Sequence, residues 1–417
     1  MPAAKLGLRA NLAQFSLLVL VNAFVGAMVG MERSILPAIA EEEFAVAARA
    51  GVLSFIIAFG ISKAGTNYVA GRMSERYGRK PVLVLGWLVA VPVPFLLMWA
   101  PSWDWIIAAN VLLGVSQGLT WSMTVIMKID LAGPKKRGLA MGLNECAGYF
   151  AVALAALLTG AIASEYGLRP APFYPGIVFV VLGLIASVVL VAETREHAAV
   201  EQEQAGHGVG EAVPPPSGRE LFVRTTLTDR NLSSATQAGF VNNLNDGMAW
   251  GLFPILFAAA GMTLQQIGWL AALYPAAWGI GQLVTGALSD RTGRKPLIVG
   301  GMALQAVAIV VTVSAGDFVG FAAGALLLGI GTAMVYPTLL AAIGDVAAPS
   351  WRASAVGVYR LWRDLGYAAG AIFAGALADQ LGLEVAVLCI AGLTMTSAVV
   401  AALRMSETLP PSDAPSQ

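Results

Sequence analysis

Long apolar runs separated by short polar loops make up most of the chain. A helix crosses the hydrocarbon layer of a membrane, about 30 Å thick, with about 20 mostly apolar residues. Strands of a membrane β-barrel are much shorter, at about 10 residues of alternating character. The pattern therefore predicts an all-α membrane protein with twelve transmembrane helices, at 12–38, 49–70, 80–99, 103–130, 137–163, 171–192, 232–260, 264–287, 296–314, 318–343, 353–380 and 383–404.

Composition agrees with a chain that is largely surrounded by lipid. Of 417 residues, 57% are hydrophobic and 12% are charged, whereas soluble domains have about 25% charged residues. The formal net charge of zero argues against a nucleic-acid partner. The first run is longer than the apolar core of a signal peptide, so we interpret it as an uncleaved first helix. Cys146 and Cys389 both lie in apolar runs, which favours small buried side chains over a disulfide.

Lysine and arginine residues indicate the orientation, because they are enriched in cytoplasmic loops. They gather near the N-terminus and in the loops after the second, fourth and eighth runs, whereas most loops on the opposite side are acidic. Both termini are therefore expected in the cytoplasm. The long polar stretch 194–230, with three consecutive prolines at 214–216, is interpreted as a cytoplasmic linker. The expected organisation is a six-helix bundle at 1–193, the linker at 194–230, a second six-helix bundle at 231–405 and a cytoplasmic tail at 406–417.

The two halves of the chain repeat each other. The segment GRMSERYGRKP at 71–81 matches GALSDRTGRKP at 286–296, and 286 − 71 gives an offset of 215. The same offset relates Asp130 to Asp345 and Arg137 to Arg352. An even number of spans in each copy makes the two copies parallel, as in transporters whose halves are related by an axis along the membrane normal. We therefore expect two pseudo-symmetric bundles with a solute path where they meet.

The repeated segment resembles the signature of the major facilitator superfamily between spans two and three, roughly G-x-x-x-D-R-x-G-R-K. Its positions here are Gly71, Glu75, Arg76, Gly78, Arg79 and Lys80, and again Gly286, Asp290, Arg291, Gly293, Arg294 and Lys295. The resemblance covers about residues 12–404, with Glu75 in place of the usual aspartate. It implies the six-plus-six fold and alternating access by rocking of the halves.

These loops are candidates for gating. An acid at position 75 or 290 can pair with nearby arginines or with the start of a helix, and such bonds could form in one state only. Asp130 and Arg137, which lie at the same ends of their spans, are expected to take part. The alternative is that the basic loops fix only the orientation of the chain.

The motifs of proton-coupled drug exporters are not matched. Those exporters usually have an arginine shortly before the pair that is Gln117–Gly118 here, and Gly114 occupies its place. Their fifth span usually contains a glycine–proline signature, but residues 138–163 contain no proline. A multidrug substrate range is therefore not indicated.

Ionisable side chains within the predicted spans are candidates for the solute or proton pathway, because hydrocarbon does not solvate them. Both histidines lie in the linker, so proton transfer must depend on carboxylates; the candidates are Glu32, Glu145, Asp246 and Asp364. Glu32 and Arg33, in the outer part of the first span, could belong to a solute site or an external gate, or form a structural pair near the interface.

The seventh span is unusually rich in amides. Asn242, Asn245 and Asp246 fall on one face of a helix, with Trp250 one turn further on. We expect this face to contact solute. The alternative is hydrogen bonding between helices.

The eleventh span contains Arg360, Arg363 and Asp364. Arg360 and Asp364 are four residues apart and can pair, a pairing that gives Arg363 no acid on this helix. The offset of 215 relates Glu145 to Arg360, so a bridge between them could close the cytoplasmic side; each could instead be satisfied within its own half. Lys63, in the second span, also needs a counter-charge or an anionic ligand. This number of cations suits an anionic or zwitterionic solute at least as well as a lipophilic cationic drug.

The sequence therefore favours a monomeric secondary active transporter in the cytoplasmic membrane, moving a small organic solute with protons as coupling ion. Likeness to proton-linked exporters favours efflux. The alternatives are an importer or facilitator of organic anions and, from another class, a receptor or scaffold that does not transport. There is no nucleotide-binding loop and no cluster of metal ligands, so we expect neither an enzyme nor a cofactor nor a metal site.

Overall fold

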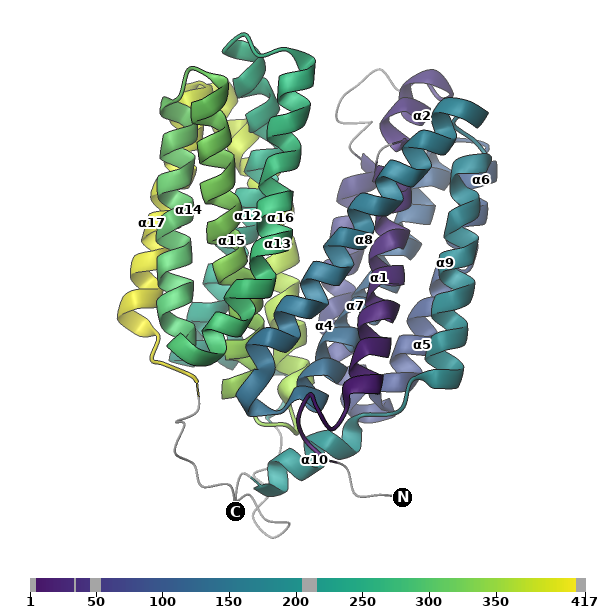
Figure 1. Ribbon diagram of the computed structural model, residues 1–417, viewed down its shortest axis with the longest axis vertical. Helices are drawn as coiled ribbons and strands as arrows, with labels where there is room; N and C mark the ends of the chain where they lie inside the picture. The colour runs from purple at the N-terminus through teal and green to yellow at the C-terminus, as the bar shows by residue number, and fades with distance from the viewer. Residues whose placement is uncertain (1–4, 34, 46–53, 205–215, 410–417) are drawn as a thin grey trace. The chain divides into compact units, whose positions relative to one another are not determined.

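A computed structural model describes residues 5–33, 35–45, 54–204 and 216–409, apart from the side chains of Arg33, Glu41, Leu264 and Gln265. All regular structure in these residues is helical (Figure 1). The predicted all-α class is confirmed. Helices suit a membrane because each satisfies its own backbone hydrogen bonds.

The predicted spans of the N-terminal half correspond to single helices or to consecutive helices. Helices α2, α6 and α9 each have a proline at their first or second position. Proline has no N–H and is favoured in the first turn of a helix, so it marks the places where a new helix begins. In chain order the elements are α1 (Leu12–Arg33), α2 (Leu36–Glu42), α4 (Ser54–Tyr77), α5 (Arg79–Ala90), α6 (Pro92–Trp99), α7 (Trp103–Ala132), η1 (Pro134–Lys136), α8 (Arg137–Tyr166), η2 (Ala171–Phe173), α9 (Tyr174–Ile185) and η3 (Ala186–Leu190).

Among the described residues, three short helical elements lie in the predicted linker, and six long helices follow. Helices α12 and α16 have 30 residues each, which gives each a length of about 45 Å, enough to cross a bilayer. The elements are α10 (Arg195–Gln204), α11 (Gly218–Val223), η4 (Arg224–Thr228), α12 (Arg230–Ala259), α13 (Leu264–Thr292), α14 (Arg294–Ser314), α15 (Phe318–Val346), α16 (Arg352–Leu381) and α17 (Leu383–Arg404).

The chain forms two compact units. The first comprises Met1–Gly133, Asn144–Pro215 and Pro349–Gly357, and the second comprises Pro134–Leu143, Pro216–Ala348 and Val358–Gln417. In the first unit α7 packs against α1, α4, α5 and α6. In the second unit α15 packs against α12, α13 and α14, while α17 covers α12 and α14. The first turns of α8 and α16 belong to the second and first units, respectively.

Hydrophobicity separates three of the long helices from the others. Among the described residues, nine helical segments are long and apolar enough to span a membrane by these criteria alone. Helices α4, α12 and α16 are not among them. These are the helices that contain Lys63, Asp246 and Arg360. Their lower hydrophobicity therefore results from polar side chains in the middle of helices that are otherwise long enough to cross.

The repeat is visible in the backbone as well as in the letters. Gly78 and Gly293 separate α4 from α5 and α13 from α14, with φ angles of 98° and 100°. Gly167 and Gly382 are related by the same offset and have φ angles of 85° and 87°. Residues with a Cβ rarely adopt this conformation. Glycine at these positions permits the sharp reversals between consecutive helices.

Candidate functional site

The second unit contains a buried carboxylate in the middle of α12. Asp246 is 4% exposed. The hydroxyl of Tyr274, from α13, donates a hydrogen bond to Asp246 and lies 3.3 Å from the hydroxyl of Thr332, from α15. Three helices thus meet around one acidic side chain that sequence reasoning had proposed for the pathway.

Aromatic rings extend this group toward α16. Tyr274 stacks on Trp278 with ring centres 6.1 Å apart, and Trp278 meets Tyr336 edge-on at 5.8 Å. The guanidinium of Arg363 lies 4.0 Å from the centre of the Tyr336 ring, which is a favourable cation–π geometry. We call Asp246, Tyr274, Trp278, Tyr336 and Arg363 the α12–α16 cluster.

The charged side chains of α16 do not form the pair that a spacing of four residues predicts. Arg363 donates to its neighbour Asp364 at 2.6 Å and also attracts Asp246 electrostatically. Asp364 is therefore engaged by Arg363, and the predicted pair of Arg360 with Asp364 is not formed. Arg363, whose guanidinium lies over the Tyr336 ring, bonds to the carboxylate of the next residue instead. Arg360 is 1% exposed, and none of its three guanidinium nitrogens has a hydrogen-bond partner among the described residues.

The amides of α12 mostly bond within the unit. Gln305, from α14, accepts from Asn245 and donates to Asn242, both at 2.9 Å. Thr394, from α17, donates to Asn245 at 2.7 Å. These bonds correspond to the alternative of hydrogen bonding between helices. Trp250, one turn beyond Asp246, is 48% exposed and is not part of the cluster.

The first unit contains a second group of buried polar side chains. Lys128 donates to Asn144 at 2.5 Å, and Asn144 donates to Glu145 at 2.7 Å. Trp121 also donates to Glu145, at 3.2 Å. Lys63 is half-buried, with its ammonium 5.3 Å from the centre of the Trp121 ring. We call Lys63, Trp121, Lys128, Asn144 and Glu145 the α7–α8 cluster.

The remaining predicted pathway features are Glu32, Arg33 and a bridge between Glu145 and Arg360. Glu32 is buried at 1% exposure near the end of α1. The side chain of Arg33 lies outside the described part of the chain. Glu145 and Arg360 belong to different units, so the bridge between them stays a prediction.

The first copy of the signature is tied to residues distant in sequence. Arg79 donates to Asp130 at 3.2 Å. Glu75, beyond the predicted span 49–70, accepts from the backbone N–H of Ser354 at 2.8 Å and from its hydroxyl at 2.6 Å. Burial raises the pKa of the Glu75 carboxyl, while the bonds from Ser354 and the charges of Arg79 and Arg72 oppose the rise. Glu75 therefore caps the first turn of α16, where the helix dipole favours an anion.

The second copy makes the equivalent arrangement at α8. Asp290 accepts from the backbone N–H groups of Gly138 and Leu139, at 2.9 and 2.8 Å. Arg294 and Arg137 both donate to Asp345, at 2.9 and 2.8 Å. The signature acids therefore bond to a helix start, which is one of the two arrangements that the gating hypothesis allows. Arg76 and Arg291, by contrast, are exposed.

Sequence reasoning missed one further pair of carboxylates. Glu193 accepts from the backbone N–H groups of Arg79 and Lys80, at 3.1 and 3.0 Å. Glu407 accepts from those of Arg294 and Lys295, at 2.7 and 3.2 Å. The signal was present as Glu–Thr at 193–194 and 407–408, but 407 − 193 is 214, so a fixed offset of 215 does not align the two.

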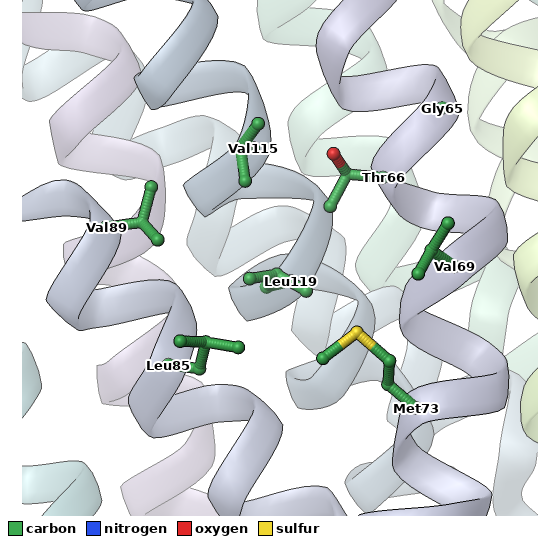
Figure 2. A pocket seen from close by; sticks show the side chains of 8 residues that line it. All are labelled: Gly65, Thr66, Val69, Met73, Leu85, Val89, Val115 and Leu119. Carbon is green, nitrogen blue, oxygen red and sulfur yellow. The ribbon is translucent and has the colours of Figure 1, made fainter.

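Outside the clusters, a groove of about 320 Å³ lies between α4, α5 and α7 (Figure 2). Its lining is almost entirely apolar, and includes Val69, Leu85 and Leu119. Val69 and Leu85 are well exposed. Such a surface suits lipid chains better than a polar solute.

Comparison with known proteins agrees with the fold and the repeated signature. The model of the Major Facilitator Superfamily matches residues 13–232 and 236–417. The uncharacterized MFS-type transporter STM4428 of Salmonella typhimurium is 26% identical over 371 residues, which are 82% of this chain and 84% of that protein. The 3-(3-hydroxy-phenyl)propionate transporter of Escherichia coli is 33% identical over 114 residues, 27% of this chain and 28% of that protein.

Solved structures show the same architecture. The human organic anion transporter MFSD10 superposes with a TM-score of 0.74 at 17% identity, over 93% of this chain and 98% of that one. Structures of this kind have the twelve-helix fold, so the predicted architecture is confirmed. These relatives are transporters and not enzymes.

Proposed function

The chain belongs to the Major Facilitator Superfamily, and on that premise we propose that it moves a small organic solute across the cytoplasmic membrane with protons as the coupling ion. Membership itself makes the chain a multi-pass transporter of small solutes. Proton coupling, a monomeric state and cytoplasmic termini are parts of the proposal.

The observation that supports proton coupling is the position of Asp246. An ionised carboxylate in the middle of a membrane helix is stable only when other groups replace water around it. Tyr274 and Arg363 do this from α13 and α16. Protonation would neutralise the acid and remove its attraction for Arg363. One proton would thus change the contacts of α12 with α16, which is what coupling requires.

The α7–α8 cluster supplies a second carboxylate. Glu145 is fully buried and shares Asn144 with Lys128. The lysine compensates the charge of Glu145 in the present arrangement. We therefore assign the main coupling role to Asp246 and a secondary one to Glu145.

The signature loops would control the change between the two states of the transport cycle. Glu75 and Asp290 each bond to the first turn of a helix, α16 and α8 respectively. We propose that these bonds open and close as the solute site changes sides. Arg79, Arg294, Asp130 and Arg137 would hold the loops in place through their ion pairs.

The direction of transport has two candidates. Export follows from the general likeness that the sequence indicates. Import of an organic anion is the second candidate, and the two buried arginines of α16 favour it. An importer of this kind would move solute and proton together, whereas an exporter would exchange them.

Proteoliposomes that contain a pH-sensitive dye test the proposal. A panel of small carboxylates, sugars and amines would be added outside, and the internal pH would be recorded. We expect at least one solute to move protons, inward for import with protons and outward for exchange. Asp246→Asn should abolish this proton movement but leave solute exchange at equal pH, whereas Asp379→Asn, at an exposed acid near the end of α16, should retain both. Solute flux that ignores an imposed pH gradient would overturn proton coupling, and no flux for any solute would favour the receptor or scaffold.

A further inference from the structure

Arg360 is a buried positive charge in the second unit. It is 1% exposed, and its three guanidinium nitrogens make no hydrogen bond to the described residues. A buried arginine of this kind is unfavourable unless an anion compensates it. The position therefore calls for a negatively charged group.

The buried carboxylates of the same unit are already engaged. Asp246 accepts from Tyr274, and Asp364 accepts from Arg363. Asp345 accepts from both Arg137 and Arg294. Within the described part of this unit, no buried acid remains to neutralise Arg360.

The neighbourhood of Arg360 on α16 is suited to a ring-bearing anion. Arg360, Arg363 and Asp364 are spaced three and four residues apart, so they lie on one face of the helix. The guanidinium of Arg363 rests on Tyr336, which meets Trp278, which in turn stacks on Tyr274. An aromatic wall therefore begins one turn from the uncompensated charge.

We propose that Arg360 binds the carboxylate of the transported solute, and that the solute is a small monocarboxylate with an aromatic ring that lies against Tyr336 and Trp278. The proposal rests on the proposed function and adds the class of substrate. A guanidinium binds a carboxylate through two parallel hydrogen bonds. Because Asp364 and Asp246 both act on Arg363, Arg360 is the one arginine of α16 left to bind solute, which suits one carboxylate better than a dianion. Rings of this kind gain further from aromatic contact.

Thermal-shift titration of the purified full-length protein tests this site without any gradient. The probes are benzoate and 3-phenylpropionate, their amides, and benzylamine. We expect the carboxylates to raise the melting temperature and the amides and the amine to leave it unchanged. Arg360→Gln should weaken carboxylate binding about 30-fold or more, and Arg360→Lys should restore part of it, because lysine keeps the charge but not the fork.

Arg404→Gln is the matched control, since Arg404 is exposed at the end of α17. It should bind the carboxylates as the native chain does. Equal stabilisation by amides and acids, or full binding by a folded Arg360→Gln protein, would overturn the proposal. If Arg360→Gln does not fold, the Arg360→Lys protein decides. The proposal is overturned if that variant binds the carboxylates as tightly as the native chain does and binds the amides equally well. Proton movement with a sugar or an amine alone would refute the Arg360 carboxylate site but leave the proposed transport function standing. Carboxylate binding that depends on Arg360, without any proton movement, would support the site but refute proton coupling.

Discussion

Glu201 shows how much one side chain of the predicted linker can contribute. It lies on α10 and receives two hydrogen bonds from Arg352, at 2.8 and 2.7 Å. Arg352 is 2% exposed, and its nearest other acid, Asp130, is 4.0 Å away. The planar guanidinium matches the carboxylate in this arrangement. The linker is therefore an integral part of the first unit at this point.

Removal of the Glu201 charge should destabilise the protein. Glu201→Gln leaves a buried arginine without its main partner, for which we expect a loss of about 3–5 kcal/mol in the free energy of unfolding. Glu196→Gln, on the same helix but exposed, should change it by less than about 0.5 kcal/mol. Melting temperatures of the two variants in detergent provide the comparison. Equal melting temperatures would show that the Glu201–Arg352 pair contributes nothing to stability.

The side-chain partners of the polar residues could be predicted only in part, for physical reasons. The sequence allowed the signature acids two kinds of partner, nearby arginines or a helix start, and Glu75 and Asp290 both bond to a helix start. The partner of Asn242 and Asn245 could not be found, because no local pattern shows that Gln305, the one amide of α14, faces α12. The pairing of Asp364 depends on Tyr336, which holds Arg363 in place from another helix.

At the scale of elements, glycines four residues apart bring pairs of helices into direct backbone contact. In the second unit, Gly366 and Gly370 of α16 lie against the carbonyl groups of Phe240 and Leu244 on α12. In the first unit, Gly26 and Gly30 of α1 lie against those of Gly148 and Val152 on α8. Small residues at this spacing permit close packing of membrane helices. Close glycine contacts thus hold α16 against α12 in the second unit and α1 against α8 in the first unit.

A larger side chain at one of these contacts should separate the helices. Gly370→Val would place methyl groups where the Leu244 carbonyl lies, so we expect a loss of about 1–3 kcal/mol in stability and a misplaced Arg363. Gly375→Val on the same helix meets open space and is the control. Circular dichroism melts would compare the two variants. The same melting temperature for both would contradict the close α12–α16 contact.

For the whole molecule, the sequence predicted the architecture better than it predicted the site. Apolar run lengths and the offset of 215 are local and periodic signals, and both are found in the helices and in the paired φ angles. The clusters depend on side chains from three or four helices, which no local pattern specifies. Low hydrophobicity nevertheless marks helices α4, α12 and α16, which all contribute polar side chains to the two clusters.

We expect Asp246 and Arg360 to face water during transport, although Asp246 lies in the middle of α12 and Arg360 lies in the first third of α16. Single cysteines at these positions test it, as Asp246→Cys and Arg360→Cys in a chain whose Cys146 and Cys389 are replaced by alanine. Ile255→Cys on α12 and Ile372→Cys on α16 are the controls, because both isoleucines are exposed on apolar helix faces.

Each variant would be treated with a membrane-impermeant thiol reagent, applied from either side of the membrane. Cysteines at 246 and 360 should react from at least one side, and the cysteines at the apolar control positions should not. Cysteines at both positions that resist the reagent from both sides, in folded protein, would contradict it.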